Sequence, residues 1–353
     1  MTFPFFTPKA KKRDQIIAID LGSRHSKAVF LERVDEKYKL TRYVVLDAPI
    51  SEKAVSVELL AEHFRHIVQA MDTKLRQVTV SIGSHDAILR TIELPLLPAE
   101  EIRQMLKFNA KTYLQQDLKD YVFDCFIVPP RSMTGGPEGT KVPPPAKYKV
   151  WVGGVQRQVL ADLEAAIKVA GLIPDQITLG LLGPSNAFEL LPPFKDAVAL
   201  IDLGFKTSTV SIIAAGELCL SRVVEIGGGD ITASLAESMG ISYAEAEGIK
   251  IGMPAEVEAH LLPVLGPLGR DLRASIDFFE HHQDLPVGQV LLSGGAAASE
   301  YFIQNLQSEL MIPCKSWTAT GGLEVTLSPQ QTEELPAVGS QLNVAIGAAS
   351  TLF

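Results

Sequence analysis

The sequence predicts an α/β protein built from two lobes of the same design. The segment Ile17 to Gly22 returns almost letter for letter as Ala199 to Gly204, after about half of the 353 residues. Each copy joins an apolar run to the turn Asp-Leu-Gly. A repeat at so long a spacing indicates that one structural unit occurs twice. Because 46% of the residues are hydrophobic, the chain can bury the cores of two or three domains.

The first half has the order of elements expected for one ribonuclease-H-like domain. Strands are predicted at about Gln15 to Asp20, Ser26 to Val34 and Lys39 to Leu46, then a helix over Val57 to Met71 and a strand over Gln77 to Ile82. The helix is expected because its apolar residues recur every three or four positions. Three strands, a helix and a further strand form a β-meander with a crossover. The second half is expected to repeat this order, which gives a duplicated ribonuclease-H-like fold.

Residues 84–170 lie outside the repeat and are predicted to form an inserted α+β subdomain. Its elements are a strand over Ala87 to Leu94, a helix begun by Pro98, strands over Tyr121 to Val128 and Tyr148 to Gly153, and a helix that ends before Gly171. The loop Pro129 to Lys147 is rich in Pro and Gly and is expected to be a mobile hairpin tip. Alternatively, Pro143 to Pro145 could serve as a short polyproline ligand.

These elements divide the chain into three predicted parts. The first lobe comprises residues 14–83, 171–196 and 337–353, the inserted subdomain comprises residues 84–170, and the second lobe comprises residues 197–336. The second lobe is expected to carry a mostly helical cap at about residues 230–285, in which Pro263 and Pro267 predict broken helices. The small residues of Asn343 to Leu352 predict a final helix that packs on the first lobe.

Charge and cysteine content narrow the classes of function. A net charge of −9 argues against nucleic-acid binding, which requires a positive field. The three cysteines are far apart, so neither a disulfide framework nor a zinc site is expected, and a reducing cytoplasm fits best. No apolar run reaches the ~20 residues that span a bilayer. Phe3 to Arg13 could rest on an anionic membrane or form a frayed tail. The pairs His63/His66 and His281/His282 lack further ligands at suitable spacing and are expected at helix surfaces.

The two Asp-Leu-Gly turns are the strongest candidate for a functional site. An aspartate at a strand end can hold a hydrated metal ion, and the glycine lets backbone amides approach an anion. A single Asp-X-Gly is common wherever a strand ends and would indicate no function by itself. Two copies, each between β-rich runs, favour a pair of facing phosphate-binding turns at Asp20 and Asp202.

Longer motifs around these turns resemble the actin-like ATPase superfamily, and within it the branch of the PilM and FtsA families. Asp20-Leu-Gly-Ser-Arg-His-Ser-Lys27 and Asp202-Leu-Gly-Phe-Lys-Thr-Ser208 resemble the two phosphate motifs, and Leu291-Leu-Ser-Gly-Gly-Ala-Ala297 resembles the adenosine motif. Similarity to PilM in particular lies in Arg90-Thr-Ile-Glu-Leu-Pro95, Ile226-Gly-Gly-Gly-Asp-Ile-Thr232 and Gly240 to Gly252. The resemblance spans nearly the whole chain and implies an actin-like two-lobe fold with an FtsA/PilM-type insertion.

The resemblance also implies a set of ligand-binding residues. Asp20 and Asp202 would hold Mg²⁺ through water, Lys27 would neutralise the β- and γ-phosphates, and Glu247 and Lys250 would contact the ribose and base of ATP or another purine nucleotide. Two simpler alternatives remain, namely Lys27 as a solvated strand residue and Glu247–Lys250 as a surface ion pair. The other residues expected at the nucleotide are Gly22, Ser23, Gly204, Thr207, Ser208, Gly228, Gly229, Gly294, Gly295 and Ala296.

Resemblance to this branch implies a cytoplasmic, nucleotide-binding scaffold of type IV pilus assembly or of a related secretion system. A PilM-like protein is expected to bind the cytoplasmic N-terminal tail of a PilN-like inner-membrane protein and other platform components, and to reach the membrane only through partners. A homo-oligomer is a further candidate assembly. The alternatives are a small-molecule kinase of the same superfamily, which needs a cleft acid that the sequence does not single out, and an FtsA-like filament protein. The latter usually carries a C-terminal membrane helix, whereas this chain stops at Phe353.

Hydrolysis of the nucleotide is expected to be slow or undetectable. Many relatives place Gln or Glu where the attacking water is oriented, and positioning is a large part of catalysis in phosphoryl transfer. By resemblance Gly183 takes this position, and only Ser185 or Asn186 could act there through a further water. The sequence therefore predicts at most a slow ATPase.

Overall fold

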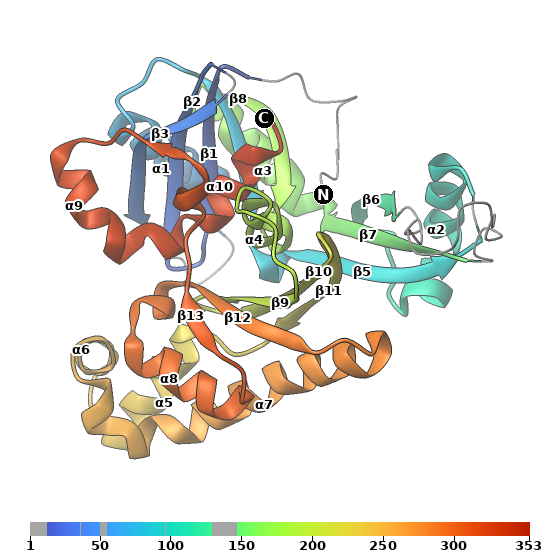
Figure 1. Cartoon of the computed structure of the whole chain (residues 1–353). Helices are drawn as coiled ribbons and strands as arrows, with labels where there is room; N and C mark the ends of the chain where they lie inside the picture. The colour runs from blue at the N-terminus through green and yellow to red at the C-terminus, as the bar shows by residue number, and fades with distance from the viewer. Residues whose placement is uncertain (1–12, 36, 50–54, 96, 129–146) are drawn as a thin grey trace.

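The computed structural model describes residues 13–35, 37–49, 55–95, 97–128 and 147–353. The expectations for the N-terminal tail before Arg13 and for the loop of Pro129 to Ala146 lie outside these residues. Figure 1 shows an upper lobe, a lower lobe, and a smaller sheet with one helix that projects to the right. Among the described residues, no helix combines the length and the hydrophobicity needed to cross a bilayer.

Two sheets that share the same order of five strands form the two lobes, which confirms the duplicated fold, and the first sheet has one further edge strand. The strand orders are β14-β3-β2-β1-β4-β8 and β11-β10-β9-β12-β13. In each sheet the first strand of the repeat, β1 or β9, is antiparallel to one neighbour and parallel to the other. The strands of the first sheet are β1 (Gln15–Leu21), β2 (His25–Val34), β3 (Lys37–Asp47), β4 (Gln77–Ile82), β8 (Ile173–Leu179) and β14 (Glu324–Val325). Those of the second are β9 (Ala197–Leu203), β10 (Ser208–Ala214), β11 (Glu217–Val224), β12 (Val287–Gly294) and β13 (Cys314–Ser316).

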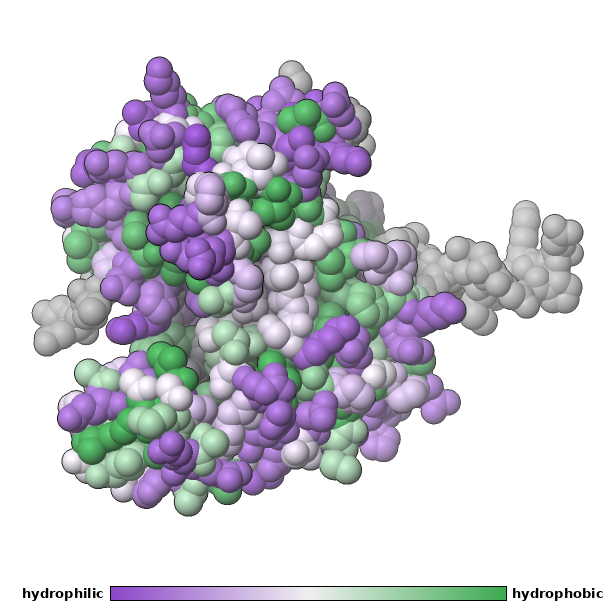
Figure 2. Space-filling model, turned by 60° about the vertical axis from the view of Figure 1, so that its left-hand side comes forward, coloured by the Kyte–Doolittle hydropathy of each residue, from purple (hydrophilic) through white to green (hydrophobic). Residues whose placement is uncertain are grey.

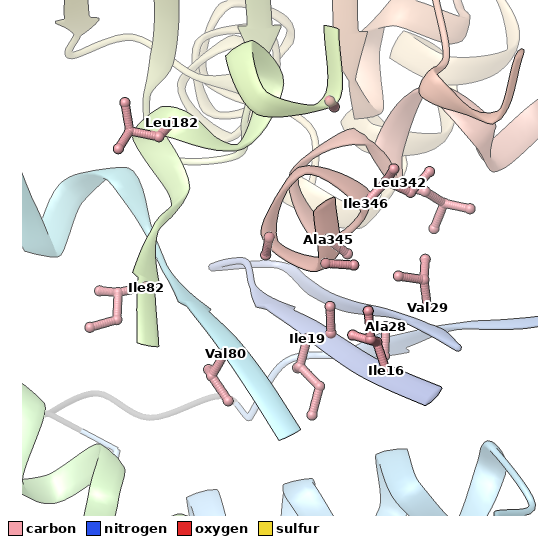
Figure 3. Close-up of a cluster of buried hydrophobic side chains, with 14 of the residues drawn as sticks. Ile16, Ile19, Ala28, Val29, Val80, Ile82, Leu182, Leu342, Ala345 and Ile346 are labelled. Carbon is pink, nitrogen blue, oxygen red and sulfur yellow. The ribbon is translucent and has the colours of Figure 1, made fainter. Parts of the chain in front are cut away.

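The first sheet is buried on both faces. The helices α1 (Val57–Ala70) and α3 (Arg157–Val169) pack together, and α10 (Asn343–Ser350) packs on β1, β2 and β4 beside α4 (Gly183–Phe188). Figure 3 shows Ala345 and Ile346 of α10 near the strands that carry Ile16 and Ala28. The expectation of a surface histidine is wrong for His63 of α1, which is buried with its Nε2 2.8 Å from Ser26 Oγ. Burial lowers the pKa of this imidazole.

The inserted subdomain is a three-stranded antiparallel sheet covered by one helix. Its strand order is β5 (Ala87–Leu94), β7 (Tyr148–Gln156), β6 (Tyr121–Ile127), and α2 (Ala99–Leu114) packs on it through Ile102 and Leu106. The sequence analysis placed α3 in this subdomain as well. In the structure α3 contacts α1 and β8, because its apolar residues Leu163 and Ile167 complete the core of the first lobe.

The chain also returns to the first lobe earlier than the expected position, residue 337. The short strand β14 pairs with β3, and α9 (Pro329–Val338) is tied to the same strand by Gln331, whose side-chain amide donates to the carbonyl of Tyr43 at 2.7 Å. Pairing of two residues with a distant strand has no sequence signature, since so short a strand shows no periodicity.

The second lobe carries four helices on and below its sheet: α5 (Gly228–Met239), α6 (Tyr243–Gly252), α7 (Glu258–Gln283) and α8 (Glu300–Leu310). The expectation of broken helices is wrong, because α7 runs unbroken through Pro263 and Pro267. A proline inside a helix costs about 3 kcal/mol. Burial of one large apolar side chain stabilises the fold by about 1.5–3 kcal/mol, so the buried face of α7 outweighs the cost of its two prolines. This face consists of Leu261, Leu265, Leu268, Leu272, Ile276 and Phe279.

Candidate functional site

The two Asp-Leu-Gly turns meet at one cavity between the lobes. The cavity has a volume of about 360 Å³ and is lined by Asp20 and Asp202, which are the last residues but one of β1 and β9. Figure 2 brings this side of the molecule forward and shows a hollow between the upper and lower parts. The carboxyl ends of the two equivalent strands therefore face each other across the cleft.

The surroundings of the two aspartates are related by the internal repeat. Across the antiparallel hairpin Asp20 pairs with Lys27 and Asp202 pairs with Thr209, in each case seven residues later. On the parallel side Asp20 lies opposite Ser81 of β4, and Asp202 lies opposite Ser293 of β12. Each aspartate is thus held between one residue of a hairpin and one serine of the next strand.

The two carboxylates have different partners: a lysine for Asp20 and a serine hydroxyl for Asp202. Lys27 Nζ lies 3.2 Å from Asp20 Oδ2, and both side chains are largely buried, so Lys27 is not a solvated strand residue. Asp202 is half-buried and accepts a hydrogen bond from Ser293 Oγ at 2.8 Å. Burial raises the pKa of Asp202, although the serine and the charge of Lys27 act in the opposite direction.

Both turns need their glycines because the backbone folds back on itself. A Cβ on Gly204 would lie 2.5 Å from the carbonyl oxygen of Thr207, and a Cβ on Gly22 would lie closer still to that of His25. In each turn the obstructing carbonyl belongs to the third residue after the glycine. The equivalence shows that the two turns share one backbone path, on which any side chain would collide.

The glycine run at the start of α5 closes the second turn. The N–H of Gly228 donates to the carbonyl of Gly204 at 2.8 Å, and the N–H of Gly229 donates to that of Phe205 at 2.8 Å. Gly228 lines the cavity, whereas Gly229 packs under the ring of Phe205 and does not. Ser208 is not among the lining residues either, because its hydroxyl donates to the carbonyl of Ile226 at 2.7 Å.

Glu247 and Lys250 of α6 belong to a buried network rather than to a surface ion pair. Lys250 is buried, and its Nζ lies 2.7 Å from Glu247 Oε2, 2.7 Å from Thr232 Oγ1 and 3.2 Å from the carbonyl oxygen of Gly228. Thr232 also donates to Glu247. Although burial opposes ionisation of Glu247, the hydrogen bonds from Lys250 and Thr232 hold its pKa below the usual value. Both side chains line the cavity in fixed positions.

The end of β12 and the residues after it form another part of the cavity wall. Gly294 has φ +90°, a conformation that favours glycine, and the backbone of Leu203 leaves no room for a Cβ there. Gly295 has no atom within 4 Å of its Cβ position, so its backbone is open to a ligand. Together with Ala296 these residues line the cavity, and Ile251 and Phe302 add apolar surface beside them.

Sequence reasoning missed several lining residues. Some lie inside the recognised turns, where the motif itself was the available signal, namely Arg24, His25, Phe205 and Lys206. Others come from segments without any motif, namely Gly83, Ser84, His85, Gly180, Ser299 and Gln341. Conversely, Ser185 and Asn186 are buried in α4 and do not line the cavity. Gly183 faces α10, since a Cβ on it would lie 2.8 Å from the Cα of Val344.

The residues present fit a magnesium nucleotide. The charged side chains of the lining comprise the cations Arg24, Lys27, Lys206 and Lys250 and the anions Asp20, Asp202 and Glu247. Cations and open glycine backbone are what a polyphosphate requires, and carboxylates at strand ends suit a hydrated Mg²⁺. Next to Asp20 in register, the buried hydroxyl of Ser81 has no partner among the described residues.

Comparison with known proteins places the chain among proteins of the same fold. It is similar to a chain of a "PilM-PilN type IV pilus biogenesis complex", with 21% identity, coverage of 97% of this chain and 98% of that chain, and a TM-score of 0.80. It is also similar to the ethanolamine utilization protein EutJ from Carboxydothermus hydrogenoformans, with 15% identity, coverage of 96% and 92%, and a TM-score of 0.54. MreB5 of Spiroplasma citri bound to ADP matches with 11% identity, coverage of 97% and 95%, and a TM-score of 0.50.

These similarities show the actin-like fold that was expected from the paired aspartate turns. The family is shown by the sequence itself, because residues 18–353 match the family described as "Type IV pilus assembly protein PilM". The match includes both aspartate turns, the inserted subdomain and the final helix. The chain belongs to the PilM family of type IV pilus assembly proteins.

Proposed function

We propose that this protein is a nucleotide-binding scaffold of type IV pilus assembly whose cleft takes Mg-ATP or another purine nucleotide. The observation that carries the proposal is the convergence of two equivalent aspartate turns on one cavity. Asp20 and Asp202 would hold the hydrated metal ion, which would supply charge neutralisation at the phosphates. Lys27 and the glycine-rich turns would bind the phosphates, and Glu247 and Lys250 would lie at the nucleoside.

We further propose that the scaffold binds the cytoplasmic tail of a PilN-like inner-membrane protein beside the inserted subdomain. Membership of the PilM family supports this partner, as does the similar structure, which contains PilM together with PilN. Binding to such a tail would place the protein at the cytoplasmic face of the inner membrane together with other platform components. Because nucleotide and tail would both act on the angle between the lobes, their affinities should be linked.

Calorimetry with a PilN-type tail peptide tests this linkage. Titration of the peptide into the protein with and without saturating Mg-ATP is expected to give dissociation constants that differ by at least about fivefold, which corresponds to about 1 kcal/mol of coupling. A peptide of the same composition in scrambled order is the control and should not bind. Absence of tail binding in both nucleotide states would remove the partner from the proposal and leave nucleotide binding to be judged separately.

Turnover of the nucleotide is expected to stay below about 10⁻² per second, the range of phosphoryl-transfer sites without a complete set of catalytic groups. Gly183 offers no side chain to a water, and Ser185 and Asn186 lie away from the cavity. Steady-state phosphate release from Mg-ATP measures this rate, with Asp202→Asn protein as the background control. Release at many per second would contradict the prediction.

A further inference from the structure

A third turn lies in the cavity beside the two aspartate turns. It consists of Gly83 and the short 3₁₀ helix Ser84–Asp86, and it follows the end of β4, which is the neighbour of β1 in the first sheet. Gly83, Ser84 and His85 all line the cavity. The segment Gly83 to Asp86, here named the third turn, also begins the inserted subdomain, since β5 starts at Ala87.

The third turn touches both aspartate turns. A Cβ on Gly83 would lie 3.3 Å from the carbonyl oxygen of Leu21, so this turn is packed against the first one. Ser84 Oγ lies 2.8 Å from Thr207 Oγ1 in the second turn. Thr207 is buried and Ser84 is half-buried, so this hydrogen bond joins the two lobes within the cavity. A hydroxyl group both donates and accepts, and a phosphate oxygen at the second turn would compete with Thr207 for the Ser84 donor.

The strand β5 connects the third turn to the core of the inserted subdomain. Ala87 and Leu89 are part of the first lobe's core, whereas Ile92 and Leu94 are part of the subdomain's core. The strand has 8 residues, and at ~3.3 Å per residue it spans about 25 Å. Figure 1 shows it running from the junction of the lobes to the right-hand subdomain. A displacement of the first residues of β5 would therefore be transmitted to the sheet in which β5 pairs with β7.

The inserted subdomain has a second link to the lower lobe. Lys149 of β7 pairs in register with Glu93 of β5, and its ammonium group donates to the carbonyl of Cys219 on β11. The same ammonium group lies 5.0 Å from the ring centroid of Trp151, which is consistent with a cation–π contact. The subdomain is thus joined to the first lobe by its chain and contacts the second lobe at Thr207 and at Cys219. Any change in the angle between the lobes must alter these contacts.

We propose that Ser84 is a phosphate-contacting residue that transmits the presence of the terminal phosphate to the inserted subdomain. The proposal rests on the proposed binding of a nucleotide in the cleft. A nucleoside triphosphate takes the Ser84 hydroxyl as a donor and releases Thr207, so that the third turn and β5 move with the phosphate. A nucleoside diphosphate, which lacks the terminal phosphate, leaves Ser84 paired with Thr207.

Hydrogen–deuterium exchange on the full chain, with ATP, with ADP and without nucleotide, tests this proposal. In the wild type ATP is expected to change exchange at residues 87–94 and 148–156, and ADP to change it much less. Ser84→Ala should bind ATP about three- to tenfold more weakly by calorimetry, as for the loss of one hydrogen bond, and should lose the change at these residues even at saturating ATP. Ser84→Thr, which keeps a hydroxyl, should retain the change.

Ser308→Ala is the matched control, because the Ser308 hydroxyl bonds within α8 to the carbonyl of Gln304; it should behave as the wild type. If Ser84→Ala does not fold, Thr207→Val removes the group that holds Ser84 when no terminal phosphate is present, so the difference in exchange between the ADP and ATP states should shrink, and an undiminished difference would contradict the proposal. An unchanged exchange response in saturated Ser84→Ala would overturn the proposal, and so would a wild type that binds ATP without any response in the subdomain. A wild type without calorimetric affinity for any nucleotide would instead overturn the proposed function, and this proposal with it.

Discussion

Gly347→Ala is expected to lower the free energy of unfolding by about 3 kcal/mol or more, at the upper end of what overpacking costs. Gly347 lies where α10 crosses α4, and the added methyl group would overlap the carbonyl oxygen of Gly183. It would also lie 2.7 Å from the carbonyl carbon of Gly183 and 3.0 Å from the backbone nitrogen of Ala187. All three obstacles are backbone atoms, so no rotamer change can relieve the overlap. The two helices would have to separate, although nearly all of their residues are buried.

Urea unfolding followed by circular dichroism measures this effect, and Gly248→Ala provides the control. Gly248 lies within α6, and its Cβ position has nothing within 4 Å. The same substitution there should be neutral or should stabilise the protein by about 0.5–1 kcal/mol, since alanine favours the helix more than glycine does. Equal stability of Gly347→Ala and the wild type would show that the crossing of α4 and α10 is looser than the structure indicates.

The sequence predicted features that are encoded locally and failed where distant packing decides. The duplicated fold and both aspartate turns were predictable because a strand, a turn and a hairpin lie within about fifteen residues of each other, twice. The unbroken α7 was not predictable from its prolines, because the side chains that stabilise it are contributed by the whole lower lobe. The packing of α3 on the first lobe was not predictable either, because its partner α1 lies about a hundred residues earlier in the chain.

At the site, the sequence predicted which segments come together, but it did not predict the orientation and burial of each side chain. Ser208 was predicted at the phosphates from its place in the motif, but it begins β10, where successive side chains point to opposite faces, so that Thr209 lines the cavity and Ser208 does not. The spacing of Glu247 and Lys250 placed them on one helix face but could not show that Lys250 is buried. Ser84 carries no motif, and only the parallel pairing of β4 with β1 brings it to the cavity.

Asp202→Asn and Asp20→Asn are each expected to weaken Mg-ATP binding by roughly 30- to 150-fold, or about 2–3 kcal/mol, as for the loss of a charged partner. The fold should survive in Asp202→Asn, because the amide oxygen can still accept the hydrogen bond from Ser293. Burial already opposes the charge of Asp202, so its removal should not lower the stability of the protein.

Removal of Mg²⁺ distinguishes metal binding by the two aspartates from a contribution of their side chains to the structure of the cavity. With EDTA present, ATP should bind Asp202→Asn at least as tightly as it binds the wild type, because the carboxylate then only repels the phosphates. Titration calorimetry with and without Mg²⁺ gives two affinities for each protein, and hence four for the wild type and one variant. Asp284→Asn is the control: Asp284 follows the last residue of α7 with φ 48°, a conformation that asparagine tolerates, and it does not line the cavity. Mg-ATP affinities unchanged in both site variants would show that the paired aspartates do not hold the metal, and the proposed nucleotide site would lose its central support.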